Sequence, residues 1–123
     1  MKKYLYLLLL IGIYVSCGSD VMQFEITDSS ISVNQGDTFE LVTTDTVDVT
    51  GGRTCDITEV SNSNIVYNGK TKGPSEHPDF EPTIYPVYLS FDAITTGTTT
   101  VTTECIGEFG EVVNTYTNEI TIN

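Results

Sequence analysis

Three cysteines have the most distinctive chemistry in this chain, because a thiol can be acylated, oxidised to a disulfide or bound to a metal. They are Cys17, Cys55 and Cys105 of a 123-residue sequence. Cys17 follows an apolar run near the N-terminus, whereas Cys55 and Cys105 lie in segments rich in Thr, Val and Ile. An odd number of cysteines in an exported protein usually gives one of them a separate role. The positions therefore suggest one role for Cys17 and another, shared role for Cys55 and Cys105.

The first 16 residues have the layout of a secretory signal. Two lysines precede about a dozen apolar residues, Tyr4 to Val15, a run too short to cross a hydrocarbon core that needs about 20 residues. The sequence Val15-Ser16-Cys17-Gly18 then resembles a bacterial lipobox, in which the cysteine receives lipid and becomes the new N-terminus. The alternative is ordinary cleavage after Ser16 that leaves Cys17 unmodified.

These features predict a lipoprotein signal over residues 1–16 and a lipidated Cys17 with a short tether over 17–22. They also predict that the protein is membrane-anchored in the cell envelope, either periplasmic or on the cell surface. The remaining residues, 23–123, are enough for one domain with one core.

Cys55 and Cys105 each fall on the apolar side of an alternating segment, so both are expected to point inward. Once Cys17 carries lipid, no other thiol is left to pair with them, and exported proteins favour disulfides. We therefore predict a Cys55–Cys105 disulfide, with two unpaired buried thiols as the alternative. Closing a loop of about 50 residues stabilises a fold by roughly 4 kcal/mol.

The sequence offers little for catalysis. Its single histidine, His77, has no orienting partner nearby, and no His/Cys cluster has the spacing of a zinc site. A nucleophile motif and a phosphate-binding glycine loop are also missing. Acids such as Asp45 and Asp48 do not form an EF-hand, which leaves a Ca²⁺ site built from separate loops as the alternative. The prediction is a non-enzyme without cofactor or bound metal.

Charge narrows the range of partners. Without the two signal lysines, three basic residues face 17 acidic ones, a formal charge of −14. Nucleic acids and anionic lipid surfaces need Lys and Arg, so both are excluded as electrostatic partners. A solvated acidic surface is the simplest interpretation of this charge, and a cationic partner or divalent metal is the alternative.

The composition after residue 20 indicates an all-β fold. Thr, Val, Ile, Tyr and Phe dominate, and no helical periodicity persists. Short alternating segments recur with turns at Gly36-Asp37, Gly51-Gly52, Asn68-Gly69, Thr95–Gly97 and Gly107–Gly110. This spacing predicts an Ig-like antiparallel β-sandwich of about seven strands.

Three connections, 45–53, 69–86 and 106–111, are expected at one end of such a sandwich. The middle one contains all four prolines, which exclude a central strand there, and it is either a binding loop or a structural connection that packs Phe80 on the sandwich edge. Phe109, between two glycines, is either a contact residue or a lid on the core. The candidate partner-binding residues of these connections are Thr50, Gly51, Phe80, Tyr85 and Phe109.

Two stretches, Val33–Leu41 and Phe91–Val101, resemble those of the chagasin-like inhibitors of papain-family cysteine proteases. The resemblance implies an Ig-like sandwich whose three loops at one end plug a protease cleft. In the first loop, only Thr50 and Gly51 match the family's motif, and Gly52 stands where the family has tyrosine. The predicted function is an exported, lipid-anchored binding module that inhibits such proteases. A non-inhibitory Ig-like surface, adhesion or assembly lipoprotein is the alternative.

Overall fold

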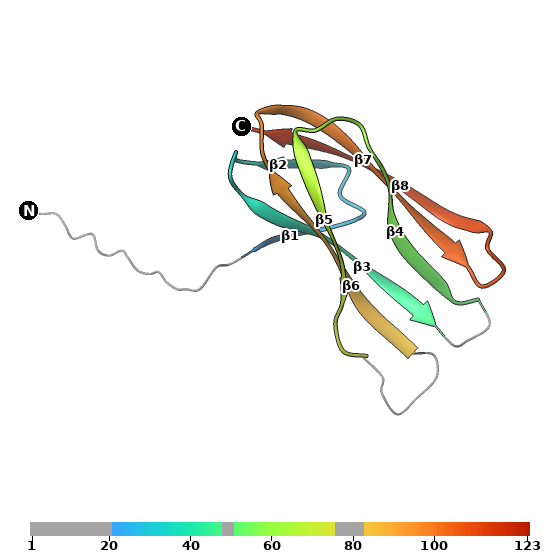
Figure 1. The fold of residues 1–123 in the computed structure, drawn as a ribbon. Coiled ribbons are helices and arrows are strands. Elements are labelled where there is room, and N and C mark those ends of the chain that lie inside the picture. The colour runs from blue at the N-terminus through green and yellow to red at the C-terminus, as the bar shows by residue number, and fades with distance from the viewer. Residues whose placement is uncertain (1–20, 48–50, 76–82) are drawn as a thin grey trace, which may run out of the picture.

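Figure 1 shows the computed structural model, which describes residues 21–47, 51–75 and 83–123. Eight strands lie in these ranges: β1 (Met22–Glu25), β2 (Ser30–Val33), β3 (Thr38–Val47), β4 (Arg53–Val60), β5 (Ile65–Lys72), β6 (Thr83–Ala93), β7 (Gly97–Gly107) and β8 (Val112–Ile122). None of the described ranges contains a helix long and apolar enough to cross a membrane.

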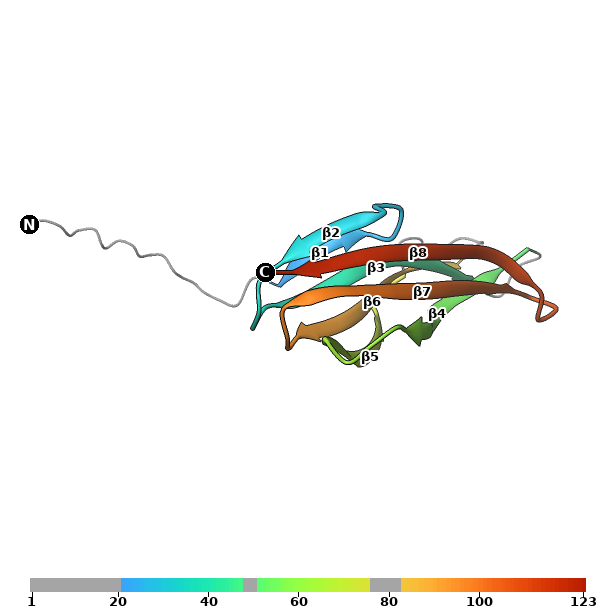
Figure 2. The same cartoon turned by 90° about the horizontal axis from the view of Figure 1, so that it is seen from above.

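The strands form two layers. The order of paired strands is β2-β8-β7-β4-β3-β6-β5, with β1 added in parallel to β3. Strands β3 and β4 share only the pair Thr46 and Arg53, so the path bends there. One layer is β1-β3-β6-β5 and the other is β2-β8-β7-β4. In Figure 2, β1 and β2 lie on one side of the molecule and β5 on the opposite side. The all-β, Ig-like sandwich predicted from the sequence is confirmed.

The core follows the period-two alternation of the strands. In β3, every second residue from Phe39 to Asp45 is buried, and in β7 the same holds from Thr99 to Cys105. Threonine fits these positions because its branched side chain packs well on a pleated surface. Phe39 stacks on Phe91 of β6, with ring centroids 5.3 Å apart. Inward-facing β-branched and aromatic residues therefore hold the two layers together.

The expected connection over 69–86 is wrong at both ends, because β5 continues to Lys72 and β6 already begins at Thr83. Gly69 does not end β5 but lies at an irregularity of its ladder with β6, where the register shifts between Tyr67 and Gly69. Its φ of 122° lies in a region that residues with a side chain rarely adopt. Gly69 therefore permits a bulge inside a strand, and the turn that the sequence predicts there is wrong.

Pro86 lies inside β6, between β3 and β5, where the sequence excluded a central strand. Its carbonyl accepts a hydrogen bond of 2.8 Å from the Gly73 amide. In an antiparallel strand, the nitrogen and carbonyl of one residue face the same neighbour, so the Pro86 nitrogen also faces β5. The β5–β6 ladder ends there, at Lys72 and Val87. The missing N–H therefore removes no hydrogen bond to β3.

Candidate functional site

Strands β3, β5 and β7 end, and β4, β6 and β8 begin, at the same end of the sandwich, with the C-terminus at the other end (Figure 1). Pairing between the strands fixes this arrangement: Val47 lies opposite Thr83, and Arg53 opposite Gly107. We call this end, with residues 51–52 and 107–111 and the flanking strand ends, the hairpin pole. The expectation that these strand ends lie together is confirmed.

The turn between β7 and β8 is closed by hydrogen bonds that hold Phe109 outward. The Gly107 amide donates to the Glu111 carbonyl at 2.7 Å, and the Gly110 amide donates to the Gly107 carbonyl at 3.1 Å. The Phe109 amide donates to Oε1 of Glu111 at 3.1 Å. The Phe109 side chain is 84% exposed, the highest value among the large hydrophobic residues described. The alternative in which Phe109 forms a lid on the core is therefore wrong.

A hydrogen bond ties this turn to the connection before β4. The Gly51 amide donates to Oε1 of Glu108 at 2.5 Å, across 57 residues of sequence. Gly51 has a φ of 82°, in the left-handed region that glycine adopts without strain. Between the two segments lies an open hollow of about 230 Å³, whose lining includes Gly52, Arg53 and Ile106. The pole thus presents an exposed aromatic ring beside a shallow hollow.

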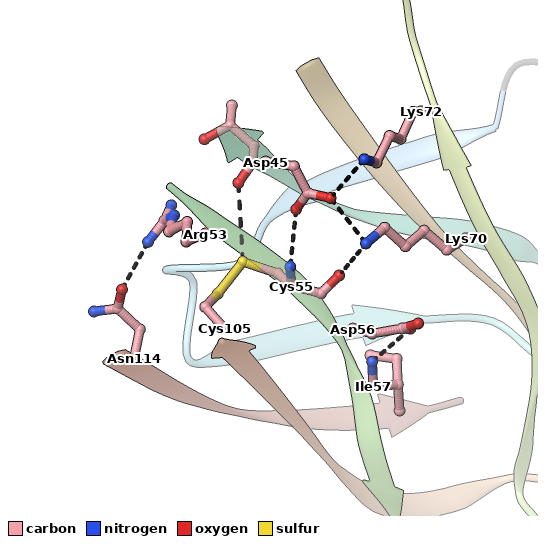
Figure 3. Close-up of a disulfide and its surroundings, with 10 residues drawn as sticks. Asp45, Arg53, Cys55, Asp56, Ile57, Lys70, Lys72, Cys105 and Asn114 are labelled. Atoms are coloured by element: carbon pink, nitrogen blue, oxygen red, sulfur yellow. Dashed lines mark hydrogen bonds and ion pairs between the residues drawn. A yellow bond between two sulfur atoms is a disulfide. The ribbon is translucent and has the colours of Figure 1, made fainter. Parts of the chain in front are cut away.

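Just inside the pole, the completely buried carboxylate of Asp45 forms ion pairs with two lysines (Figure 3). Oδ2 of Asp45 lies 2.9 Å from Nζ of Lys70 and 3.4 Å from Nζ of Lys72. Burying an isolated carboxylate is very unfavourable, and the two cations on β5, which lies beyond β6 in the same layer, offset that cost. The cluster of Asp45, Lys70 and Lys72 therefore joins β3 to β5, and we call it the buried ion cluster.

The disulfide lies directly beside the buried ion cluster (Figure 3). Cys55 and Cys105, opposite each other in β4 and β7, are bonded through their sulfurs at 2.04 Å, as the sequence predicts. The Cys55 amide donates to Oδ1 of Asp45 at 2.8 Å, and Nζ of Lys70 donates to the Cys55 carbonyl at 2.7 Å. One buried carboxylate and one disulfide thus fix β3, β4, β5 and β7 relative to one another beneath the pole.

A second polar contact, between Tyr67 and Asp56, connects β5 to β4. The Tyr67 hydroxyl donates to Oδ1 of Asp56 at 2.6 Å, while its ring lies 5.1 Å from that of Phe91. Burial raises the pKa of the Tyr67 phenol well above its ordinary value, and the hydrogen bond to Asp56 and the charge of that carboxylate raise it further. Tyr67 therefore stays neutral in the folded protein.

Some of the remaining candidate residues lie within the described ranges and others lie outside them. Thr50, Phe80, His77 and the expected lipidation site Cys17 lie outside the described residues. Tyr85 belongs to β6 rather than to a loop, which corrects its predicted position. It is half-buried, and Nζ of Lys72 lies 5.2 Å from its ring centroid. Gly51 and Phe109 are therefore the candidates that the described residues bring to the pole surface.

The sequence does not reveal the buried ion cluster, because it predicts a loop at Lys70 and Lys72 and the edge of another loop at Asp45. Alternation was the available signal: Asp45 continues the inward series of Phe39, Leu41 and Thr43. The described residues contain no group of three His, Cys, Asp or Glu side chains that could hold a metal ion.

Comparison with known proteins adds a relationship at the level of the fold. No protein-family model matches the sequence, and no curated protein matches it. Among solved structures, the cysteine protease inhibitor EhICP2 from Entamoeba histolytica matches with a TM-score of 0.64 and 13% identity, over 84% of this chain and 96% of that chain. The fold is chagasin-like. Amebosin, solved in solution, matches with a TM-score of 0.65 and 12% identity, over 85% of this chain and 99% of that chain.

At identities of 12–13%, the two matches show that the fold is shared, but they assign no role to single residues. The side chains of the pole differ from the pattern of the family that the sequence resembles. Gly52, where the resemblance places a tyrosine, is buried and offers no side chain. The large exposed apolar group is instead Phe109, on the turn between β7 and β8.

Proposed function

We propose that this chain is an exported, lipid-anchored inhibitor of papain-family cysteine proteases, and that it inserts the hairpin pole into the protease cleft. The observation that carries the proposal is the fold, which matches a cysteine protease inhibitor over 96% of that inhibitor's length. Fold alone is a weak guide to function, so the pole must also have suitable chemistry.

The pole has two properties that binding into a cleft requires. The first is a projecting apolar group, since an exposed aromatic side chain can fill a pocket at low conformational cost. Phe109 provides it, at 84% exposure. The second is rigidity, because a segment that is already ordered loses little entropy on binding. The hydrogen bonds within residues 107–111, and the bond from Gly51 to Glu108, supply it.

The acidic side chains of the pole take part in holding its loops. Two acidic residues of the turn accept backbone hydrogen bonds: Oε1 of Glu108 accepts from the Gly51 amide, and Oε1 of Glu111 accepts from the Phe109 amide. Carboxylates held in this way maintain the loop geometry and leave the phenyl ring as the contacting group. An acidic rim also favours a partner whose cleft is lined by cationic or neutral groups.

A papain assay tests the proposal. The chain from residue 18 onward, which keeps all the described strands, should inhibit papain at nanomolar concentration and compete with a peptide substrate. A trypsin-like serine protease serves as the control and should be unaffected. Absence of papain inhibition up to micromolar concentration would reject the inhibitor and favour the alternative, an Ig-like adhesion or assembly module.

The lipid anchor needs a separate measurement. It is supported by the apolar run of the N-terminus and by Val15-Ser16-Cys17-Gly18. Mass spectrometry of the protein from its native host should find a diacylated or triacylated Cys17, and Cys17→Ser should release the domain in soluble form. An unmodified N-terminus at Cys17 or beyond would reject the anchor while leaving the inhibitor proposal intact.

A further inference from the structure

Part of β8 is an open sheet edge. Strand β2 pairs with β8 only from Glu119 to Ile122, so the other half of β8, residues 112–118, has β7 on one side and no described strand on the other. Figure 1 shows this half of β8 outermost at the lower right. We call residues 112–118 the β8 edge. Unpaired strand edges present backbone N–H and C=O groups that can pair with another strand.

Hydrogen bonds in the same strand show which groups face outward. The Glu119 amide donates to the Ser29 carbonyl, on the side of β8 that faces away from β7. Because backbone groups alternate sides along a strand, Thr117 and Thr115 direct their N–H and C=O groups to the same side. Both residues are exposed, and none of the other described residues hydrogen-bonds to their backbone groups. Their four backbone groups are therefore available to a partner strand.

The other described edges carry charges or are short, whereas the β8 edge is neither charged nor short. Strand β4 has Asp56, Glu59 and a register shift between Ile57 and Glu59. Strand β5 has two lysines and a register shift at Gly69, and β1 and β2 have only four residues each. Charges, bulges and shortness are the usual means by which proteins prevent edge pairing.

The β8 edge has the sequence VVNTYTN, seven uncharged residues without proline. Its one register shift skips Val113, so the ladder with β7 is regular from Asn114 to Asn118. This stands out in a chain whose residues 17–123 carry a formal charge of −14. Two copies repel each other over most of their acidic surface. The β8 edge is a place where they can approach without bringing carboxylates together over these seven residues.

The side chains of the edge are also self-complementary. Antiparallel pairing of two copies about Thr115 places Thr115 opposite its own copy and Val113 opposite Thr117. Cross-strand pairs of β-branched residues and of threonines stabilise such contacts. The flanking Glu111 and Glu119 lie opposite each other in this register, which makes the pairing sensitive to salt.

We propose that the β8 edge pairs with the same edge of a second copy, forming an antiparallel, two-fold symmetric dimer centred on Thr115. The two β2-β8-β7-β4 layers then become one continuous sheet across the dimer. The contact involves neither residues 51–52 nor Phe109, so it does not require inhibition of a protease.

Sedimentation of the chain from residue 18 onward tests the dimer, together with two variants at the edge. The unmodified chain should shift from monomer to dimer with rising concentration, and more readily at 500 mM than at 50 mM salt. The reason is that salt screens the acidic repulsion, with a screening length of about 4 Å at the higher and about 14 Å at the lower concentration. Thr115→Pro removes one outward N–H and leaves the bonds to β7 intact, since an edge strand tolerates proline facing solvent. It should weaken dimerisation at least about tenfold.

Cysteine crosslinking keeps the test decisive if Thr115→Pro does not fold. Paired residues in an antiparallel ladder have Cα atoms about 5.5 Å apart, within disulfide reach. Thr115→Cys should therefore form a disulfide-linked dimer under mild oxidation. Thr58→Cys, on the exposed β4 edge of the same layer, should stay monomeric.

The dimer would be overturned by a monomer at all concentrations and salts, by equal crosslinking of Thr115→Cys and Thr58→Cys, or by undiminished dimerisation of Thr115→Pro. Crosslinking without a concentration-dependent dimer would also count against it, since chance collisions can trap a surface thiol. A β8 edge that pairs only with an extended peptide of another protein would leave this chain monomeric.

Discussion

Nζ of Lys70 lies 2.9 Å from Oδ2 of Asp45, a carboxylate that is completely buried. Nζ of Lys70 also donates to the Cys55 carbonyl, so one ammonium group joins β5 to both β3 and β4. Lys72 approaches the same carboxylate oxygen at 3.4 Å, but its side chain is 37% exposed. The two lysines therefore contact the same carboxylate but differ in how deeply they are buried. Their removal should have different effects on stability.

Lys70→Met should destabilise the domain by about 3 kcal/mol, because it leaves the buried carboxylate of Asp45 with only the more distant cation. For a domain of about 100 residues, this corresponds to a fall in Tm of about 12 °C or more. Lys72→Met is the matched control, and an exposed ion pair of this kind contributes less than about 1 kcal/mol. Thermal unfolding followed by circular dichroism measures both. Equal falls in Tm would show that Lys70 has no special role.

Phe109→Ala should leave Tm almost unchanged and weaken papain inhibition at least about tenfold, if the pole binds as proposed. The reason is that Phe109, at 84% exposure, contributes little to the core. Phe91→Ala is the contrasting variant: this ring is fully buried against Phe39, and its loss should cost about 3–5 kcal/mol. A large fall in Tm for Phe109→Ala would mean that the ring stabilises the fold and is not a contact residue.

The parts of this structure that follow from local alternation were predictable. The inward positions of Cys55 and Cys105, and hence their disulfide, follow from period-two burial, and the closely spaced turns indicate the sandwich. Gly69 and Pro86 misled the prediction because each residue has two structural uses. A glycine with positive φ suits a bulge as well as a turn, and a proline whose nitrogen faces the end of the β5–β6 ladder removes no hydrogen bond to β3.

Contacts between distant segments could not be inferred in the same way. The bond from Gly51 to Glu108 joins positions 57 residues apart, and the buried ion cluster depends on how β3 is placed near β5. None of the segments in these two contacts carries a local sequence pattern that identifies its partner segment. The outward direction of Phe109 likewise depends on hydrogen bonds to Glu111, which the sequence alone allows but does not require.

Removal of the disulfide by the double variant Cys55→Ala with Cys105→Ala should destabilise the domain by roughly 4 kcal/mol, because the unfolded chain regains the entropy of a loop of about 50 residues. The same change should raise the urea m-value, since a chain without the crosslink exposes more surface on unfolding. Urea titration measures both quantities. An unchanged m-value with lower stability would indicate lost packing around Asp45 instead of lost loop closure.

Both sulfurs belong to fully buried residues, so a reductant should reach them mainly after unfolding. Thiol labelling in dithiothreitol should therefore accelerate with urea concentration in parallel with the unfolding rate. Rapid labelling of the folded protein, at a rate independent of urea, would contradict the burial of Cys55 and Cys105.

The last prediction concerns alkaline pH. Burial and Asp56 favour the neutral phenol of Tyr67, which raises its pKa in the folded protein above the ordinary value of 10.0. Above about pH 10, the unfolded chain has released this proton while the folded protein retains it, so the unfolded state is favoured. The contribution of Tyr67 to stability is therefore fully present below about pH 9 and is lost as pH rises above 10.

Tyr67→Phe keeps the ring near Phe91 but removes the ionisable hydroxyl and its bond to Asp56. The variant should lose about 1 kcal/mol at pH 7 and show a smaller fall in stability between pH 9 and 11 than the parent chain. Urea unfolding at several pH values measures this difference in slope, and absorbance at 295 nm should show a tyrosine that ionises only as the parent chain unfolds. Identical slopes for the two proteins would mean that Tyr67 releases its proton as readily in the folded state as in the unfolded one.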